Sequence, residues 1–273
     1  MFRILAFLFA VIIALNSTSQ GNISFESVDI STLNNEPKAW TVDNIDNLIV
    51  VEGNIINKYD STGNRTFTQS IKSIGEISKI EPINTLKLLV FSEEQQCICI
   101  LDNTLSINGK CKYLDEFGIR NAKVVATSNR PNLVWVYDQF NSSLYLIDII
   151  QSKVIQLVEN FSGIAKLKSE VIAIQEYDNH LFLSDNTGIY EFDMMLNWVN
   201  YYEIPSISTF QIWKKMVFFT SNQQLMFQFL QGNYSKAVNA PTYTAESLII
   251  QGNQLYLKRG KRIEKILLKS KND

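Results

Sequence analysis

The stretch Leu48-Ile49-Val50-Val51-Glu52-Gly53-Asn54-Ile55-Ile56-Asn57-Lys58-Tyr59-Asp60 decides the fold, because its pattern recurs along the whole chain. It consists of an aliphatic strand, a tight turn and a second strand. Five further segments share this pattern, and they begin at Leu88, Val134, Leu181, Met216 and Leu255. The six start points lie 40, 46, 47, 35 and 39 residues apart, a mean of about 41 residues.

Another short strand precedes each of these pairs, and helical periodicity is nearly absent. The candidate first strands are Ala39–Val42, Ile77–Ile80, Lys123–Thr127, Val171–Gln175, Phe210–Trp213 and Ser247–Ile250. Only Leu114–Ala122 is expected to form a helical turn or two. A repeated four-stranded unit of roughly 40–45 residues is typical of a β-propeller blade.

The sequence therefore predicts an all-β fold, a six-bladed β-propeller, with a pair of β-sandwiches as the rival architecture. The sixth unit ends early, near Leu268, so its outer strand must come from elsewhere. Residues 23–30 alternate apolar and polar side chains, and we expect them to close the last blade, which leaves no long free edge. The expected blades of the single domain, residues 21–273, are 39–76, 77–122, 123–169, 170–207, 208–245 and 246–273 plus 22–38.

Four of the six second strands end in an apolar or aromatic residue followed by aspartate. These aspartates are Asp60, Asp102, Asp148 and Asp193. An aspartate at a strand end readily accepts hydrogen bonds from the following turn. We therefore expect turn-capping carboxylates here, in preference to a ring of catalytic ones.

The N-terminus has the pattern of a secretory signal peptide, residues 1–20. Arg3 precedes an uncharged apolar run from Ile4 to Leu15, and a small polar segment follows. The run is shorter than the ~20 residues that a spanning helix needs, although an uncleaved anchor is the alternative. The mature chain is thus expected to be exported, periplasmic or extracellular, with no later transmembrane segment.

The composition fits an ordinary folded protein, with 46% hydrophobic and 19% charged residues. The single histidine, His180, excludes sites that need two histidines, and it falls in a predicted turn without an orienting partner. The chain has no Gly-x-Ser-x-Gly elbow and no glycine-rich phosphate loop. A non-catalytic protein is therefore the first expectation.

The three cysteines are Cys97, Cys99 and Cys111, too few for a disulfide scaffold. Cys97 and Cys99 share one face of a strand, and Cys111 lies beyond a turn. A disulfide with Cys111, with Cys99 as the candidate partner, is possible in an oxidising compartment. Buried thiols are the open alternative, and a metal site lacks a fourth ligand.

The charge is uneven along a chain whose formal net charge is −2. Seven basic residues lie among the last 16 residues, whereas residues 23–257 carry 17 basic and 25 acidic side chains. This basic C-terminal edge could touch an anionic surface or an acidic partner, or it could be a solvated edge that discourages aggregation. A nucleic-acid partner is not expected for an exported protein.

Residues 40–51, 54–64 and 101–106 carry a family resemblance. The segment with Trp40, Asp43 and Tyr59-Asp60 resembles the blades of NHL-like and TolB-like six-bladed propellers, in which a polar loop precedes a strand and a Tyr-Asp…Gly turn leads outward. The whole mature chain resembles small exported bacterial propellers without assigned function. The resemblance implies the architecture and leaves the activity open, and blades five and six depart from the pattern.

Six-bladed propellers of the lactonase type hold calcium near the central axis through Glu, Asn and Asp oxygens. The blade register places Asp43, Glu81, Asn129, Glu176 and Gln211 near the ends of the innermost strands. If they ring the funnel mouth, the protein is a metal-dependent hydrolase with calcium, or a small-ligand sensor. The alternative is that they are ordinary polar strand ends, with no cofactor.

Trp198, Tyr201 and Tyr202 form the densest aromatic cluster in a predicted loop or outer strand. Propellers present function on surfaces held by a rigid scaffold, so these residues are candidates for an exposed contact. Burial between blades is the alternative. The leading hypothesis is an exported binding or scaffold module for a protein or cell-envelope component.

Overall fold

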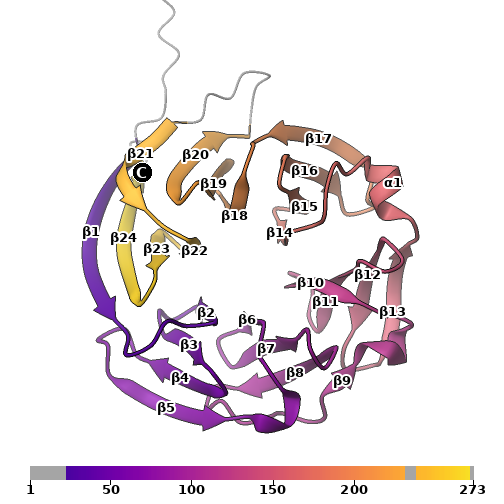
Figure 1. Cartoon of the computed structure of the whole chain (residues 1–273), viewed down its shortest axis with the longest axis horizontal. Coiled ribbons are helices and arrows are strands. Elements are labelled where there is room, and N and C mark those ends of the chain that lie inside the picture. Colours follow the sequence, from indigo (N-terminus) through magenta and orange to yellow (C-terminus); the bar gives the residue numbers. More distant parts are fainter. Residues whose placement is uncertain (1–22, 231–237, 271–273) are drawn as a thin grey trace, which may run out of the picture.

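The computed structural model describes residues 23–230 and 238–270 and folds them into six four-stranded antiparallel sheets around a central axis (Figure 1). The predicted six-bladed β-propeller is confirmed. The predicted signal peptide lies outside the described residues. No helix in the described part of the chain is both long and apolar enough to cross a membrane.

In blades 1 to 5 the four strands follow one another in chain order, with the first strand innermost. Blade 1 contains β2 (Ala39–Val42), β3 (Leu48–Glu52), β4 (Ile55–Tyr59) and β5 (Arg65–Ser70). Blade 2 contains β6 (Lys79–Asn84), β7 (Lys87–Ser92), β8 (Cys97–Asp102) and β9 (Lys112–Tyr113). Blade 3 contains β10 (Ala122–Thr127), β11 (Leu133–Asp138), β12 (Ser143–Asp148) and β13 (Lys153–Val158).

The other three blades complete the ring, and three short helical segments lie in the connections. Blade 4 contains β14 (Ala173–Tyr177), β15 (His180–Asp185), β16 (Gly188–Asp193) and β17 (Trp198–Glu203). Blade 5 contains β18 (Ile207–Trp213), β19 (Met216–Ser221), β20 (Gln224–Phe229) and β21 (Val238–Thr244). Blade 6 contains β22 (Ser247–Gln251), β23 (Gln254–Arg259), β24 (Arg262–Ser270) and β1 (Ile23–Thr32). The helical segments are η1 (Lys72–Ile74), η2 (Leu114–Phe117) and α1 (Phe161–Ala165).

The predicted closure of the ring is confirmed. β1 pairs with β24 from Ile23 opposite Ser270 to Thr32 opposite Arg262, with a bulge between Ser27 and Asp29. The chain therefore supplies the outer strand of blade 6 from its N-terminal side and the other three strands from its C-terminal side (Figure 1). This arrangement joins the two ends of the fold through backbone hydrogen bonds.

Four of the approximate starts differ from the structure by one or two residues, among them that of the inner strand of blade 4, which begins at Ala173 and not at Val171. The inner strand of blade 2 starts at Lys79 and not at Ile77, because Ile77 is buried in the core between blades 1 and 2. Ala122 belongs to blade 3 and Ile207 to blade 5, each one residue before the predicted start of its blade. Both residues pair across a bulge with the next strand, a feature that the sequence pattern does not show. Helix α1 was not predicted.

The aspartates at the strand ends cap turns, as predicted. Three of them each cap a five-residue turn of the same type. In each turn, the aspartate Oδ1 accepts hydrogen bonds from the backbone N–H groups two and four residues further along the chain. The bonds come from Thr62 and Asn64 to Asp60, from Thr104 and Ser106 to Asp102, and from Met195 and Asn197 to Asp193, at 2.8–3.0 Å. Asp148 accepts from Ile150 and Gln151 in a tighter turn. These carboxylates are structural.

The same turns make the stability depend on pH. Hydrogen bonds, the largest from the side chains of Thr62, Thr104 and Asn197, lower the pKa values of Asp60, Asp102 and Asp193. A lowered folded-state pKa stabilises the fold above the unfolded value of about 3.9, and this contribution is lost as the pH falls through the folded value. We expect the triple variant Asp60→Asn, Asp102→Asn, Asp193→Asn to lose less stability than the wild type between pH 5 and pH 3. Urea midpoints at the two pH values measure this, and a triple variant with the same pH dependence as the wild type would contradict it.

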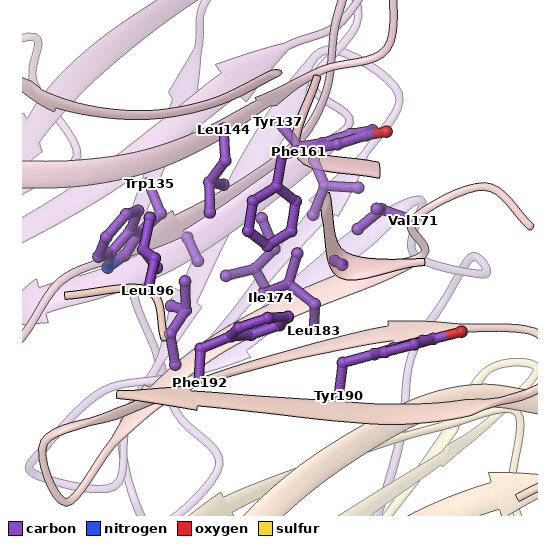
Figure 2. Packing of buried hydrophobic residues seen from close by; sticks show 14 of the residues in the cluster. Trp135, Tyr137, Leu144, Phe161, Val171, Ile174, Leu183, Tyr190, Phe192 and Leu196 are labelled. Carbon is purple, nitrogen blue, oxygen red and sulfur yellow. The ribbon is translucent and has the colours of Figure 1, made fainter. Parts of the chain in front are cut away.

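Apolar clusters fill the interfaces between neighbouring blades. In the interface of blades 3 and 4, Trp135 and Leu144 face Leu183 and Phe192, with Phe161 of α1 between them (Figure 2). Trp135 is fully buried. Such interfaces make the ring of blades a continuous core.

The structure joins Cys99 on β8 to Cys111, just before β9, in a disulfide. Cys97 is a free thiol and is buried, and this burial raises its pKa. The disulfide fastens the segment that leads to the short outer strand of blade 2, where β9 contributes only two residues.

Candidate functional site

Side chains and backbone from all six innermost strands line a central channel of about 770 Å3. Of the residues predicted at the funnel, Glu81, Asn129, Glu176 and Gln211 line this channel. Asp43 directly follows the innermost strand β2, as expected, but it is not among the lining residues. Its carboxylate is buried, accepts hydrogen bonds from the Ile45 and Asn47 backbone, and lies 3.1 Å from the Lys58 ammonium.

Glu81 and Gln211 connect neighbouring blades. Glu81 Oε2 accepts a hydrogen bond of 2.8 Å from the Thr127 backbone, and Gln211 Oε1 accepts one of 3.0 Å from the Ile250 backbone. Gln175, which the sequence analysis missed, does the same with Ile212 at 2.8 Å. All three side chains thereby satisfy backbone N–H groups of the next innermost strand. These hydrogen bonds join neighbouring blades.

Glu176 is the most enclosed acidic group at the channel. It is 9% exposed and accepts hydrogen bonds from the Trp135 indole at 2.7 Å, the Ser128 hydroxyl at 2.6 Å and the Asn129 backbone at 3.3 Å. All three donors belong to blade 3, whereas Glu176 belongs to blade 4. A buried carboxylate with three donors is satisfied without a further ligand. The Asn129 residue itself is exposed.

Two ion pairs also involve lysines that line the channel. Lys38 lies 2.6 Å from Glu76, and Lys123 lies 2.6 Å from Glu93, with both pairs about half exposed. Exposed pairs of this kind contribute only ~0–1 kcal/mol each. Among residues 23–230 and 238–270, no group of three His, Cys, Asp or Glu side chains is placed to hold a metal ion.

His180 begins β15, where it pairs with Tyr177 of β14, and it is not among the residues that line the channel. Its Nδ1 atom lies 2.9 Å from the Asp178 carbonyl oxygen, and its Nε2 atom lies 3.8 Å from the Glu191 carboxylate. Glu191 in turn accepts a hydrogen bond of 2.6 Å from the Tyr202 hydroxyl. Burial, and then this bond, raise the pKa of Tyr202.

The predicted aromatic cluster lies on β17, the outermost strand of blade 4, and its three members differ in exposure. Tyr202 is only 6% exposed and packs between blades 4 and 5, so its prediction as an exposed contact was wrong. Tyr201 is half-buried against Tyr190, with the Lys168 ammonium 4.4 Å from its ring. Trp198 is 51% exposed.

Trp198 belongs to a larger surface that we call the apolar rim. Its members are apolar side chains, 40–62% exposed, on β13, α1 and β17: Val154, Ile155, Leu157, Ile164, Trp198 and Val199. These three elements follow one another along the outer circumference of the ring (Figure 1). Ring contacts connect two of them, since Phe161 of α1 packs on Phe192, and Phe192 packs on Trp198 of β17.

Bulges account for two of the exposed aliphatic side chains, and the others lie on outermost strands or on α1. The outermost strands of blades 1, 3 and 4 each carry one extra residue opposite the third strand: Thr66, Ile155 and Val199. In blade 1 this residue is polar, and the strand exposes one large apolar side chain, Phe67. In blades 3 and 4 it is Ile155 and Val199. The apolar rim is thus a property of two blades and not of every outer strand.

The basic C-terminal edge takes part in closing the ring. The Lys258 ammonium lies 2.6 Å from Glu246 and 3.1 Å from Glu36, and Lys269 lies 2.5 Å from Glu26 on β1. Lys261 donates to the Asn34 carbonyl oxygen at 2.7 Å. These cations thus hold the N-terminal segment, and Lys271 lies outside the described residues.

Solved structures with a similar chain path are β-propellers. Virginiamycin B lyase from Staphylococcus aureus is 11% identical to this chain. The superposition covers 91% of this chain and 100% of the lyase chain, with a TM-score of 0.58. A chain of the mitotic checkpoint complex is 10% identical over 97% and 98%, with a TM-score of 0.65. The Pan2 WD40 domain of Neurospora crassa is 8% identical over 89% and 96%, with a TM-score of 0.60. No protein-family model and no curated protein matches the sequence. At these identities the likeness shows the fold alone.

Proposed function

We propose that the protein is a non-catalytic binding module that docks a partner protein on the apolar rim. The exposed aliphatic and indole side chains of two neighbouring blades carry this proposal. A contiguous apolar surface is unfavourable in water, and it becomes favourable when a partner covers it. Large aromatic side chains such as Trp198 commonly anchor such interfaces.

The contacts at the channel favour the rim over the funnel as the site. Glu81, Glu176 and Gln211 already accept hydrogen bonds from the neighbouring blade. On the rim, the bulges at Ile155 and Val199 disturb the free strand edges, so side-chain packing, and not addition of a partner strand, would carry the contact. The similar structures include a WD40 domain, so the proposal concerns a fold that this protein shares with such domains.

The proposal places the mature chain outside the cytoplasm, as an NHL-like or TolB-like exported propeller. The N-terminal pattern around Arg3 and the apolar run that follows support this location. The disulfide between Cys99 and Cys111 also fits an oxidising compartment. A partner in the cell envelope would meet the rim there.

The rim variant Ile155→Ser, Trp198→Ala should recover at least about tenfold less partner than the wild type, because it removes an exposed anchor and its neighbour. The measurement is crosslinking of the full chain in its own cells, quantified by mass spectrometry. Binding of the purified partner to the two proteins then gives the ratio of Kd values.

The matched control is Phe67→Ala, which removes an exposed aromatic side chain from the equivalent strand of blade 1. It should leave partner recovery unchanged. Equal recovery with the rim variant, or an equal loss with the control, would contradict docking on the rim. Melting curves of all three proteins establish that each is folded.

The central channel supports a second candidate, a small-ligand sensor, because its volume of about 770 Å3 lies within the ~300–1,000 Å3 range of ligand sites. A metabolite panel read by thermal shift tests it. The lactonase-type alternative is tested by metal analysis of the purified protein, followed by Glu81→Gln. Retained calcium that this variant loses would favour the hydrolase.

A further inference from the structure

A second cavity lies where the ring closes, between blades 6 and 1, and it is independent of the apolar rim. Its volume is about 290 Å3. The walls come from the end of β1 and the segment after it, the β2–β3 turn, the end of β4 with its turn, and strands β23 and β24. This volume is at the small end of the ~300–1,000 Å3 range of ligand sites, so the cavity suits one ring-sized molecule.

The floor of this closure cavity is apolar. Leu33, Leu48 and Ile263 line it and are at most 9% exposed. They belong to one cluster with Tyr256, and Tyr59 packs against that cluster. The lining therefore offers a ligand both aliphatic carbon and two phenol rings. This lining favours a ligand with an apolar C–H face.

The lining also includes an ion pair with a long separation. The Lys265 ammonium lies 3.6 Å from Asp46 Oδ2 and 5.6 Å from the centre of the Tyr256 ring. The Tyr256 hydroxyl lies 2.6 Å from Gln254 Oε1 and 3.4 Å from Asp46 Oδ1. Asp46 thus has only long contacts, and both it and Lys265 retain capacity for hydrogen bonds with a ligand.

Two further polar side chains, those of Tyr59 and Asp60, line the cavity. Within the part of the chain that the structure describes, the Tyr59 hydroxyl makes no hydrogen bond, and burial raises its pKa, so it remains a donor at neutral pH. The Asp60 carboxylate, which accepts the bonds of its own turn from Thr62 and Asn64, also belongs to the lining and is an acceptor. Donors and acceptors therefore face the same small space.

The charges of the lining select the ligand. Asp46 and Asp60 oppose a phosphate or carboxylate, whereas Lys265 opposes a free ammonium or metal cation. A hydroxyl group both donates and accepts, so it can serve Asp46, Asp60, Lys265 and Tyr59 alike. From this combination of polar wall and apolar floor, we propose that the closure cavity binds one neutral polyhydroxylated ring, a single monosaccharide unit.

Occupancy of this site would strengthen the closure of the ring, because the cavity is shared by β1, blade 1 and blade 6. The ligand would bind only the closed form, so it shifts the equilibrium toward that form. Reduced amide exchange along β1 and β24 is the expected structural sign. The proposed protein-binding function does not depend on this site.

The test uses the full mature chain with D-glucose, D-galactose, N-acetyl-D-glucosamine and their methyl glycosides as probes. At about twenty times its Kd, a bound sugar should raise the Tm by about 4 °C in a domain of this size. Tyr59→Phe, which removes one hydroxyl, should lose most of that rise. Sugars also stabilise proteins without binding, but that effect would be equal in the wild type and the variant.

The control variant is Tyr113→Phe, at an exposed tyrosine of blade 2, which should keep the full rise. Saturation-transfer NMR on the wild type, with Lys265→Met as a second variant, decides the question if Tyr59→Phe does not fold. Binding of a methyl glycoside assigns the site to the end of a sugar chain, and binding of the free sugar alone assigns it to a metabolite. Equal Tm rises in all variants, or no saturation transfer from any probe, would overturn the proposal.

Discussion

Deletion of β1 should open the ring and lower the Tm by at least ~10 °C. The deletion turns β24 into a long free edge, because every pairing from Ile23–Ser270 to Thr32–Arg262 is lost. It also removes Phe25, whose ring contacts Phe227 and Tyr243 of blade 5 at 6.0 Å. Full burial of a phenylalanine contributes about 1.5–3 kcal/mol, of which the partly buried Phe25 supplies only a part, so the lost strand pairings account for the rest. Each kcal/mol moves the Tm by ~2–4 °C in a domain of this size. The measurement compares the melting of a chain that starts at Leu33 with that of one that starts at Gly21.

A separate peptide of residues 22–34 should restore much of the lost stability, because an extended peptide can add to a free sheet edge. The control is Val28→Ser, which alters the bulge residue of β1, 58% exposed, and should leave the Tm within about 1 °C. A chain that starts at Leu33 and melts cooperatively within about 2 °C of the longer chain would contradict the role of β1 in closing the ring.

The six blades and their closing strand were predictable because they depend on local patterns. Aliphatic runs such as Leu88–Phe91 form strands wherever both faces are covered, and turns recur between them. Asp102 is another local case, since its carboxylate bonds only to residues two to four positions on. Such features can be predicted without knowing how the blades pack against one another.

The roles of the channel residues depend on how the blades approach one another. Gln175 and Gln211 occupy equivalent positions, opposite Phe182 and Phe218, and each reaches the innermost strand of the next blade. Their bonding partners, Ile212 and Ile250, lie 37 and 39 residues away in the chain. A sequence pattern identifies such residues as polar but not their bonding partners, so it selected Gln211 without showing that this side chain joins two blades, and it gave no reason to select Gln175.

The apolar rim was missed because the local sequence of its strands resembles that of buried strands. The segment Lys153-Val154-Ile155-Gln156-Leu157-Val158 has the composition of a buried strand, but it forms the outermost strand of its blade. Its bulge then turns Ile155 toward solvent. On β17 the bulge at Val199 similarly separates exposed Trp198 from buried Tyr202. A bulge shifts the alternation of side chains by one residue, and nothing in the local sequence marks it.

The rim lies over the interface of blades 3 and 4, so the rigidity of that interface bears on binding. We expect Trp135→Ala to destabilise the fold by about 3–5 kcal/mol, because it removes a fully buried indole from the centre of the cluster in Figure 2. The variant also removes the donor that lies 2.7 Å from Glu176, and a buried acceptor that loses a donor adds to the loss. In a domain of this size the Tm should fall by roughly 8–15 °C.

Trp198→Ala is the matched control, since it makes the same change in the same pair of blades at a side chain that is 51% exposed. Its cost should be about 1 kcal/mol or less, because half of the indole already lies in water. Trp135→Phe separates the two contributions of Trp135, as it keeps most of the volume but not the hydrogen bond to Glu176. Similar losses for Trp135→Ala and Trp198→Ala in calorimetry would contradict the placement of Trp135 at the core of this interface. The expected difference would instead separate a residue that holds two blades together from one that is free to contact a partner.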